Sequence, residues 1–314
     1  MDELLAADLH LDAATVAVPT VHHHAVASAL LDAGLDLLVE KPLAATLAEA
    51  DDLIARADKG SRILQPGHLE RFNPAVLAVQ PRLRRPMFFE SHRLSIFTPR
   101  ALDVDVVLDL MIHDLDIVLT FAASPVREVR AVGLPILSPK VDIANVRVEF
   151  ESGCVANFTA SRVSTERVRK LRFFEPRQYV SIDYARQDLL VIRLDANDAA
   201  GAGNGAAACR APSLPPEIAA ALAAGKADSA LLAKLAAAGA GPAPGLSFVK
   251  PPVTPGEPLR LEILSFLDSV RTRQQPRVAA RQGREALALA LEIQASMAAH
   301  AKRAGLEDFF NPGA

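Results

Sequence analysis

The sequence predicts an α/β protein in which a parallel sheet covered by helices is followed by an α+β domain with a large, mostly antiparallel sheet. Two apolar runs near the start, residues 13–18 and 35–39, show no apolar-polar alternation and are joined by a helical stretch, which indicates parallel strands buried on both faces. From Met87 onward, strand patterns follow one another with only one helix between them, which favours antiparallel pairing.

The first domain is expected to span residues 1–86 and to consist of strands that alternate with helices. Thr20 is a candidate N-cap for the first helix, and Gly34 suits the C-terminal end of that helix because glycine adopts the left-handed conformation without strain. The strands are expected at residues 13–18, 35–39 and 62–65, and the helices at about residues 22–33 and 47–57.

The second domain is expected to span residues 87–314 and to hold a flexible insertion, rich in Ala, Gly and Pro, at residues 196–256. A Gly-x-Gly-x-Gly run starts at Gly201, but no buried strand precedes it, so it is not interpreted as a phosphate-binding turn. The strands are expected at residues 87–95, 126–134, 143–150, 154–162, 168–174, 178–183 and 188–194, and the helices at residues 105–121, 257–272 and 282–302, with short helices at 216–224 and 228–238 in the insertion.

Composition and charge limit the classes of partner. The chain has 314 residues, 50% of them hydrophobic and 23% charged, which is typical of a globular protein with a sizeable core. Its net charge of -3, without a block of Lys and Arg, favours a small-molecule partner over nucleic acid or a membrane. Cys154 and Cys209 are too few for a disulfide framework, and the N-terminus lacks the pattern of a signal peptide, so we expect a cytoplasmic location.

Three loops are expected to converge at the carboxyl ends of the parallel strands, where open α/β sheets bind their ligands. These loops contain Pro19-Thr20, Glu40-Lys41-Pro42 and Gln65-Pro66-Gly67-His68. Lys41 is the most informative residue, because it ends an apolar strand directly before a proline. Taken alone, it is also compatible with an ordinary surface lysine.

Asp109 and His113 form a second candidate pair. Their i, i+4 spacing places them on one face of the predicted helix, with Asp116 one turn further along. A carboxylate in this position can orient an imidazole that acts as a general base. The alternative is a capped or core-satisfied histidine beside acids on the helix surface.

Glu40-Lys41-Pro42, followed further along the chain by Asp109-x-x-x-His113, resembles the glucose-fructose oxidoreductase / inositol dehydrogenase (Gfo/Idh/MocA) family of nicotinamide-dependent sugar dehydrogenases. The resemblance covers residues 1–195 and 257–300. Residues 67–74 (GHLERFNP) and 160–164 (ASRVS) are similar to the branch that oxidises the 3-hydroxyl of UDP-N-acetylglucosamine for 3-amino sugar or lipid A assembly.

This resemblance implies roles for the candidate residues. Lys41 polarises or helps to deprotonate the reacting hydroxyl, His113 acts as general base, and Asp109 orients the sugar or the imidazole. Hydride passes to C4 of the nicotinamide of NAD or NADP, and Glu40 contacts the nicotinamide ribose, beside a Lys41-Pro42 peptide that is expected to be cis. The candidate cofactor-binding residues are Pro19, Thr20, His23, Glu40, Lys41 and His68.

The three consecutive histidines, His22 to His24, are not expected to bind a metal. Successive residues of a helix diverge by about 100°, so the three side chains cannot converge on one ion. His23 is instead a candidate contact for the cofactor, near the start of a helix.

Three further residues are candidates for binding the substrate. Arg71 and Asn73 could meet a sugar or a diphosphate, and the alternative is an interdomain ion pair and an N-cap before Pro74. Arg162 lies among arginines of the second domain that could hold a nucleotide diphosphate, and the alternative is a solvated sheet face or a subunit contact.

No Gly-x-Gly-x-x-Gly follows a strand in this chain, although that turn holds the cofactor pyrophosphate in dinucleotide-binding folds. The resemblance therefore implies a partial, N-terminally truncated Rossmann-type sheet, and we expect the polypeptide to bind NAD(P) weakly or not at all. The alternative function is a catalytically silent sugar-nucleotide-binding or scaffold remnant. A homodimer or homotetramer is expected, because the open face of the antiparallel sheet should be buried by a partner subunit.

Overall fold

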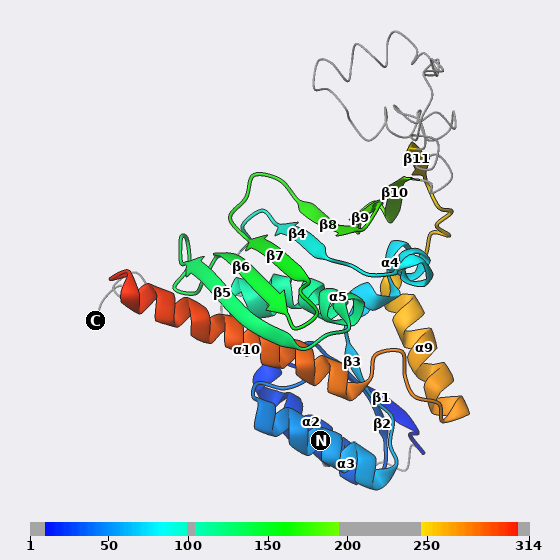
Figure 1. Ribbon diagram of the computed structural model, residues 1–314. Coiled ribbons are helices and arrows are strands. Elements are labelled where there is room, and N and C mark those ends of the chain that lie inside the picture. Colours follow the sequence, from blue (N-terminus) through cyan, green and yellow to red (C-terminus); the bar gives the residue numbers. More distant parts are fainter. Residues whose placement is uncertain (1–9, 99–103, 195–245, 307–314) are drawn as a thin grey trace, which may run out of the picture.

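The computed structural model describes residues 10–98, 104–194 and 246–306 (Figure 1). These residues form a parallel sheet of three strands and a second sheet of eight strands. The predicted α/β class, with a mostly antiparallel second sheet, is confirmed. The two short helices expected within 216–238 lie outside the described residues.

The parallel sheet is buried between helices on both faces. Its elements are β1 (Ala13–Val16), α2 (His23–Asp32), β2 (Asp36–Glu40), α3 (Leu47–Gly60), β3 (Leu64–Gly67) and, from near the end of the chain, α9 (Pro258–Thr272). Leu37 and Val39 pack with the buried side chains of α2 and α3. Leu38, which alternates with them, packs with Phe266 of α9 on the opposite face. Each residue of β2 before Glu40 is therefore buried, which explains its continuous apolar pattern.

Local signals account for several helix ends. Glu49 and Thr46 form a capping box at the start of α3, in which each main-chain N–H donates to the other side chain, at 3.2 and 3.1 Å. Gly34 follows α2 with a φ of 85°, as predicted. The prediction of Thr20 as N-cap is wrong: Thr20 begins the 3-10 turn η1 (Thr20–His22), and His22 holds the N-cap position without a side-chain bond.

The larger sheet has the strand order β11-β10-β9-β8-β4-β7-β6-β5, and only the β4–β7 pair is parallel. The strands are β4 (Phe88–Leu94), β5 (Val126–Leu134), β6 (Ile143–Phe150), β7 (Val155–Ser161), β8 (Val168–Glu175), β9 (Gln178–Asp183), β10 (Asp188–Leu194) and β11 (Leu246–Val249). The expectation of a flexible insertion over residues 196–256 is wrong for residues 246–249, which form β11 and pair with β10.

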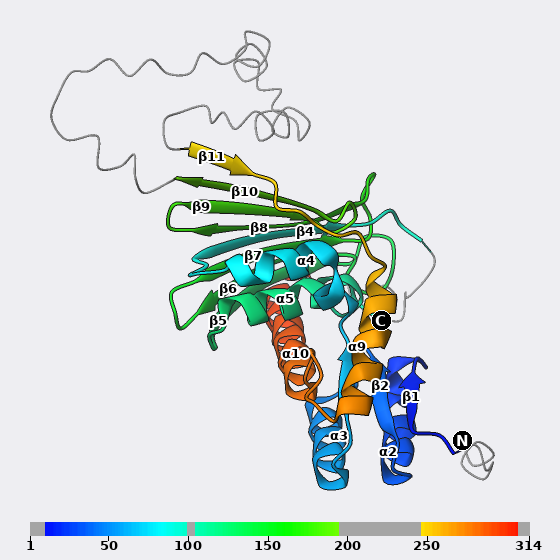
Figure 2. The same cartoon turned by 90° about the vertical axis from the view of Figure 1, so that its right-hand side faces the viewer.

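Helices cover one face of this sheet, the lower face in Figure 2. They are α4 (Pro74–Val79), α5 (Ile112–Ala122) and α10 (Ala280–Arg303), and the turn η2 (Leu69–Phe72) leads into α4. The helix expected at residues 105–121 is a π-helical turn, η4 (Val107–Met111), followed by α5. The helix α4 was not predicted. Its N-cap is Asn73, directly before Pro74, which agrees with the alternative interpretation of Asn73 as a helix cap.

Helix α10 connects the two sheets. It packs along β5 and α5 at one end and contacts α3 and β3 at the other (Figures 1 and 2). The domain boundary at residue 86 stays a prediction. Among the described helices, none has the length and apolar composition that crossing a membrane requires.

Candidate active site

The carboxyl ends of β2 and β3 approach each other closely because Gly67 has no side chain. Glu40 and Gly67 are paired across the two strands. A Cβ atom on Gly67 would lie 3.0 Å from the Cα atom of Glu40 and 3.1 Å from its Oε2 atom, tighter than ordinary contacts. Glycine at this position therefore leaves room for the Glu40 carboxylate at the rim of the sheet.

Lys41 extends from the rim to the turn η4. Its Nζ atom donates to the main-chain oxygens of Asp109, at 2.7 Å, and Leu108, at 3.3 Å, and lies 3.8 Å from Asp109 Oδ1. The side chain is 19% exposed. Burial lowers the pKa of Lys41, and the nearby carboxylates of Asp109 and Glu40 oppose that change. The Lys41-Pro42 peptide is cis, as expected.

Asp109 lies within the π-helical turn η4, and His113 is the second residue of α5, which follows it directly. Wide turns of this kind are rare and are frequent at functional sites. The hydrogen bonds from Lys41 to two carbonyl oxygens of this turn join the parallel sheet to the helix that carries His113. The residues that the two motifs predicted are thus brought together by contacts between segments 68 positions apart.

His113 is partly exposed, and its Nδ1 atom is buried without a hydrogen-bond partner among the described residues. Burial, followed by the charges of Lys41 and Arg93, lowers the pKa of His113 well below its ordinary value, so the ring is neutral at pH 7. No hydrogen bond joins it to Asp109 within the described part of the chain. In this arrangement Asp109 faces Lys41, and its role in orienting the sugar or the imidazole stays a prediction.

The remaining cofactor candidates differ in their surroundings. His68 is 1% exposed, and neither of its ring nitrogens has a hydrogen-bond partner among the described residues. Burial lowers the pKa of His68, partly opposed by Asp116. His23 is also 1% exposed, but both of its ring nitrogens contact main-chain oxygens. Pro19 is exposed at the N-cap position of η1, and Thr20, which begins that turn, is partly exposed.

Arg71 and Asn73 are buried and bonded within the protein. Arg71 pairs with Asp116 at 3.4 Å and donates to Gln282 of α10 at 2.8 Å. Asn73 donates to the main-chain oxygen of Tyr184 at 3.0 Å. The structure therefore shows the alternative interpretation, an ion pair between elements and a helix cap, and substrate binding by either residue stays a prediction.

Arg162 is 4% exposed and forms an ion pair with the fully buried Asp142 at 2.7 Å. It also donates to the main-chain oxygen of Val104 at 2.9 Å and to Ser138 at 3.1 Å. Hydrogen bonds from Ser138, Arg162 and main-chain N–H groups hold the pKa of Asp142 below its ordinary value, against the effect of burial. Arg162 thus connects loops beside the large sheet, and its contact with a substrate stays a prediction.

One residue near the site was missed by the sequence reasoning. Glu262 of α9 is fully buried, and neither of its carboxyl oxygens has a hydrogen-bond partner among the described residues. Burial and the carboxylates of Glu40 and Asp116 raise its pKa to about 8. The only signal was its spacing from Phe266 and Ser269, which places a carboxyl on the buried face of a predicted helix.

Comparisons with known proteins agree with this geometry. Residues 1–68 match the family described as "Oxidoreductase family, NAD-binding Rossmann fold", and residues 75–177 match "GFO/IDH/MocA C-terminal domain". The chain is 38% identical over 202 residues to UDP-N-acetylglucosamine 3-dehydrogenase of Acidithiobacillus ferrooxidans. It is 32% identical over 125 residues to inositol 2-dehydrogenase 1 of Saccharopolyspora erythraea, an alignment that covers 36% of each chain.

A solved structure of UDP-N-acetylglucosamine 3-dehydrogenase GnnA from Acidithiobacillus ferrooxidans has the same fold, with a TM-score of 0.76 and 30% identity. That superposition covers 99% of this chain and 82% of the other. The sequence alignment with the curated enzyme spans less of both proteins, 64% of this chain and 64% of the relative.

Proposed function

The chain belongs to the Gfo/Idh/MocA family of NAD-binding oxidoreductases, and from this premise we propose that it is an NAD(P)-dependent sugar dehydrogenase. The observation that carries the proposal is the contact between Lys41 and the turn η4, which holds Asp109 and leads directly into the helix that carries His113. Oxidation of an alcohol requires a base for the hydroxyl proton and a cation near the developing alkoxide. Neutral His113 and Lys41 can supply these groups, with the carboxylate of Asp109 close to Lys41.

The proposed reaction removes a proton and a hydride from one carbinol. The Lys41 ammonium group stabilises the developing alkoxide, and neutral His113 takes the hydroxyl proton on the partly exposed side of its ring, away from the buried Nδ1 atom. Asp109 keeps Lys41 cationic in its partly buried position. The nicotinamide cofactor, when bound, accepts the hydride at C4.

The residues at the sheet rim fit the nicotinamide half of such a cofactor. Glu40 is partly exposed beside Lys41 and can accept hydrogen bonds from ribose hydroxyls. His68 has ring nitrogens without a partner among the described residues, so it retains hydrogen-bonding capacity for a ligand group. Thr20, Glu40, Lys41 and His68 are the residues that we expect to hold it.

The proposed substrate is a UDP-N-acetylhexosamine, oxidised at its 3-hydroxyl group. The similarity to UDP-N-acetylglucosamine 3-dehydrogenase supports this choice over an inositol, because it extends over more of the chain at higher identity.

The test is turnover of UDP-N-acetylglucosamine with NAD or NADP by an N-terminally extended chain that supplies a Gly-x-Gly-x-x-Gly turn, followed by absorbance of the reduced nicotinamide. Lys41→Met and His113→Asn should each lower kcat by about 100- to 10,000-fold, the usual range for an acid-base group. Lys59→Met, which changes an exposed lysine at the end of α3, is the matched control and should leave kcat unchanged.

Two outcomes would contradict the proposal. Equal turnover by the wild-type protein and Lys41→Met would remove Lys41 from the chemistry. Calorimetric binding of the sugar nucleotide to that extended chain, without binding of either cofactor and without turnover, would favour a catalytically silent sugar-nucleotide-binding protein instead.

A further inference from the structure

His23 joins the two loops that carry Lys41 and the residues of η1. It is the first residue of α2 and is 1% exposed. Its Nδ1 atom lies 2.9 Å from the main-chain oxygen of Pro42, and its Nε2 atom lies 2.8 Å from that of Val18. Pro42 directly follows Lys41, and Val18 precedes Pro19 at the entry to η1. One ring therefore bridges the loops after β1 and β2.

The imidazole ring of His23 can donate hydrogen bonds, whereas the two carbonyl groups that it contacts cannot. A carbonyl oxygen only accepts hydrogen bonds, a neutral imidazole has one N–H group, and the imidazolium cation has two. At these distances the ring donates to at least one of the two carbonyl oxygens and lies in contact with the other. Loss of the ring would remove this polar partner from both buried contacts, which is unfavourable.

The ionisable groups on the elements next to His23 either bond to other residues or lie at the carboxyl end of β2. In α3, Asp52 bonds to the adjacent His24 at 2.8 Å, and Glu49 accepts from the main-chain N–H groups of Ala45 and Thr46. At the end of β2, Glu40 and Lys41 are the charged groups closest in sequence to Pro42. The two carbonyl oxygens are thus the direct polar partners of His23 among the described residues.

We propose that His23 is a positioning residue whose ring clamps the Val18 and Pro42 carbonyl groups and thereby holds Lys41 against the turn η4. The clamp acts on the peptide next to Lys41, whose Nζ atom is fixed at its other end by the oxygens of Leu108 and Asp109. The role of this clamp in catalysis rests on the proposed dehydrogenase function. The contact of His23 with the two carbonyl groups is independent of that function.

The first test measures the reactivity of the Lys41 amine and does not depend on enzymatic activity of the protein. Acetylation of Lys41 by acetic anhydride is quantified by mass spectrometry as a function of pH, because only the neutral amine reacts. His23→Phe keeps a ring of similar size without N–H groups and should move the midpoint for Lys41 upward, toward that of an ordinary lysine. His24→Phe removes the neighbouring bond to Asp52 and should leave the midpoint unchanged. An unchanged midpoint in His23→Phe would overturn the proposal.

The second test uses the wild-type protein and covers the case that His23→Phe does not fold. Nitrogen-15 NMR of the histidine rings should show a ring N–H of His23 that is protected from exchange by its hydrogen bond, and a rapidly exchanging ring N–H would overturn the clamp. His23→Gln, whose amide can donate to one loop, should give a midpoint for Lys41 between those of the wild type and His23→Phe.

Turnover separates this inference from the proposed function. If the protein is a dehydrogenase, His23→Phe should lower kcat at least tenfold with little change in KM, because Lys41 rather than substrate binding is disturbed. A shifted acetylation midpoint in a protein that never turns over the sugar nucleotide would retain the clamp and remove the dehydrogenase assignment.

Discussion

Burial changes the chemistry of individual ionisable residues around Lys41. Burial lowers the pKa values of Lys41 and His113 and raises that of Glu262, which in each case favours the neutral form. For His113 this effect is large and is reinforced by the cations Lys41 and Arg93. The protonation states at this site therefore differ from those of the same residues in water.

The pH dependence of turnover should reflect this shift. His113 acts as a base only when it is neutral, and its lowered pKa keeps it neutral well below pH 6.5. We expect kcat/KM to stay constant from pH 7.5 to pH 6 and to fall on the alkaline side as Lys41 loses its proton, below the 10.5 of an ordinary lysine. A pH-rate profile from pH 5 to 10.5 measures both limbs. An acid limb centred near pH 6.5 would contradict the assignment of His113.

Glu262 should make the folded protein less stable as the pH rises. Its carboxyl ionises near pH 4.5 in the unfolded chain and near pH 8 in the folded one. Between these values the unfolded state has lost the proton that the folded state retains, so raising the pH favours unfolding. Glu262→Gln removes this titration, and its free energy of unfolding should exceed that of the wild type by an amount that grows from pH 4.5 to pH 8, to the order of 2–4 kcal/mol.

Urea unfolding at pH 4.5, 6 and 8.5 measures this difference. Glu285→Gln, at an exposed position of α10, is the control and should track the wild type at all three values. A difference between Glu262→Gln and wild type that is the same at every pH would show that Glu262 does not titrate in this window.

At the scale of elements, the packing of α10 on β3 depends on one glycine. A Cβ atom on Gly283 would lie 2.5 Å from Cγ and 2.7 Å from Cβ of Pro66, and a proline ring in a strand cannot move aside. Gly283→Ala should therefore lower the free energy of unfolding by about 1–3 kcal/mol, despite the better helix propensity of alanine. Chemical denaturation measures the change.

Gly60→Ala is the matched control for that substitution. Gly60 also lies in a helix, but its added Cβ atom would meet only the flexible side chain of Arg62, at 3.2 Å. It should be neutral or stabilising. Equal effects of the two substitutions would show that the contact with Pro66 is relieved by a small movement of α10.

Most elements could be predicted because their signals are local. The strands β5, β6, β9 and β10 have the predicted bounds, and the other predicted strands differ by a few residues at their ends. The exceptions have non-local causes. The π-helical form of η4 has no sequence pattern of its own, and β11 is a strand only because β10 offers its edge.

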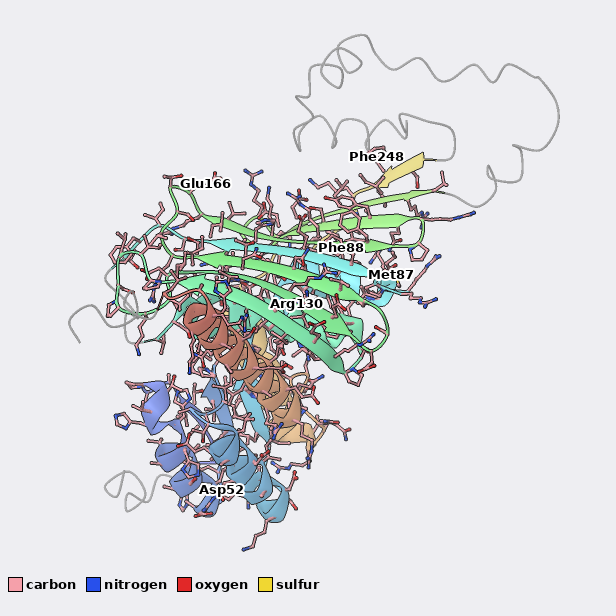
Figure 3. The ribbon with its side chains drawn as sticks, turned by 60° about the vertical axis from the view of Figure 1, so that its left-hand side comes forward. Asp52, Met87, Phe88, Arg130, Glu166 and Phe248 are labelled. Carbon is pink, nitrogen blue, oxygen red and sulfur yellow. The ribbon has the colours of Figure 1, made fainter. Side chains whose placement is uncertain are left out.

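At the scale of the whole molecule, the uncovered face of the large sheet carries a row of apolar side chains. Helices cover the opposite face, and Figure 3 labels Phe88 and Phe248 in this row. The ring centroids of Phe88 and Phe174 are 5.5 Å apart, and those of Phe174 and Tyr179 are 5.2 Å apart. Cross-strand pairs extend the row over six strands, through Val155, Phe88, Phe174, Tyr179, Ile192 and Phe248.

This row supports the expected homodimer or homotetramer, which stays a prediction. Exposed apolar rows of this kind favour association, and Phe174 is 37% exposed. Sedimentation should find an oligomer for the wild type and a smaller species for Phe174→Glu, because the new carboxylate would be buried in the interface. Lys59→Glu, on α3, is the control and should sediment like the wild type. A monomeric wild type would contradict the prediction.

The amino-acid sequence alone determined the α/β class, most elements and the identity of Lys41, Asp109 and His113, because periodicity, turn residues and motif order are properties of neighbouring positions. The tertiary structure decided which groups those residues meet. Arg71 bonds to a residue 211 positions away, His23 bridges two loops, and Glu262 is buried beside Glu40 from the opposite end of the chain. Burial and charge at the site arise from such distant contacts, which no local pattern encodes.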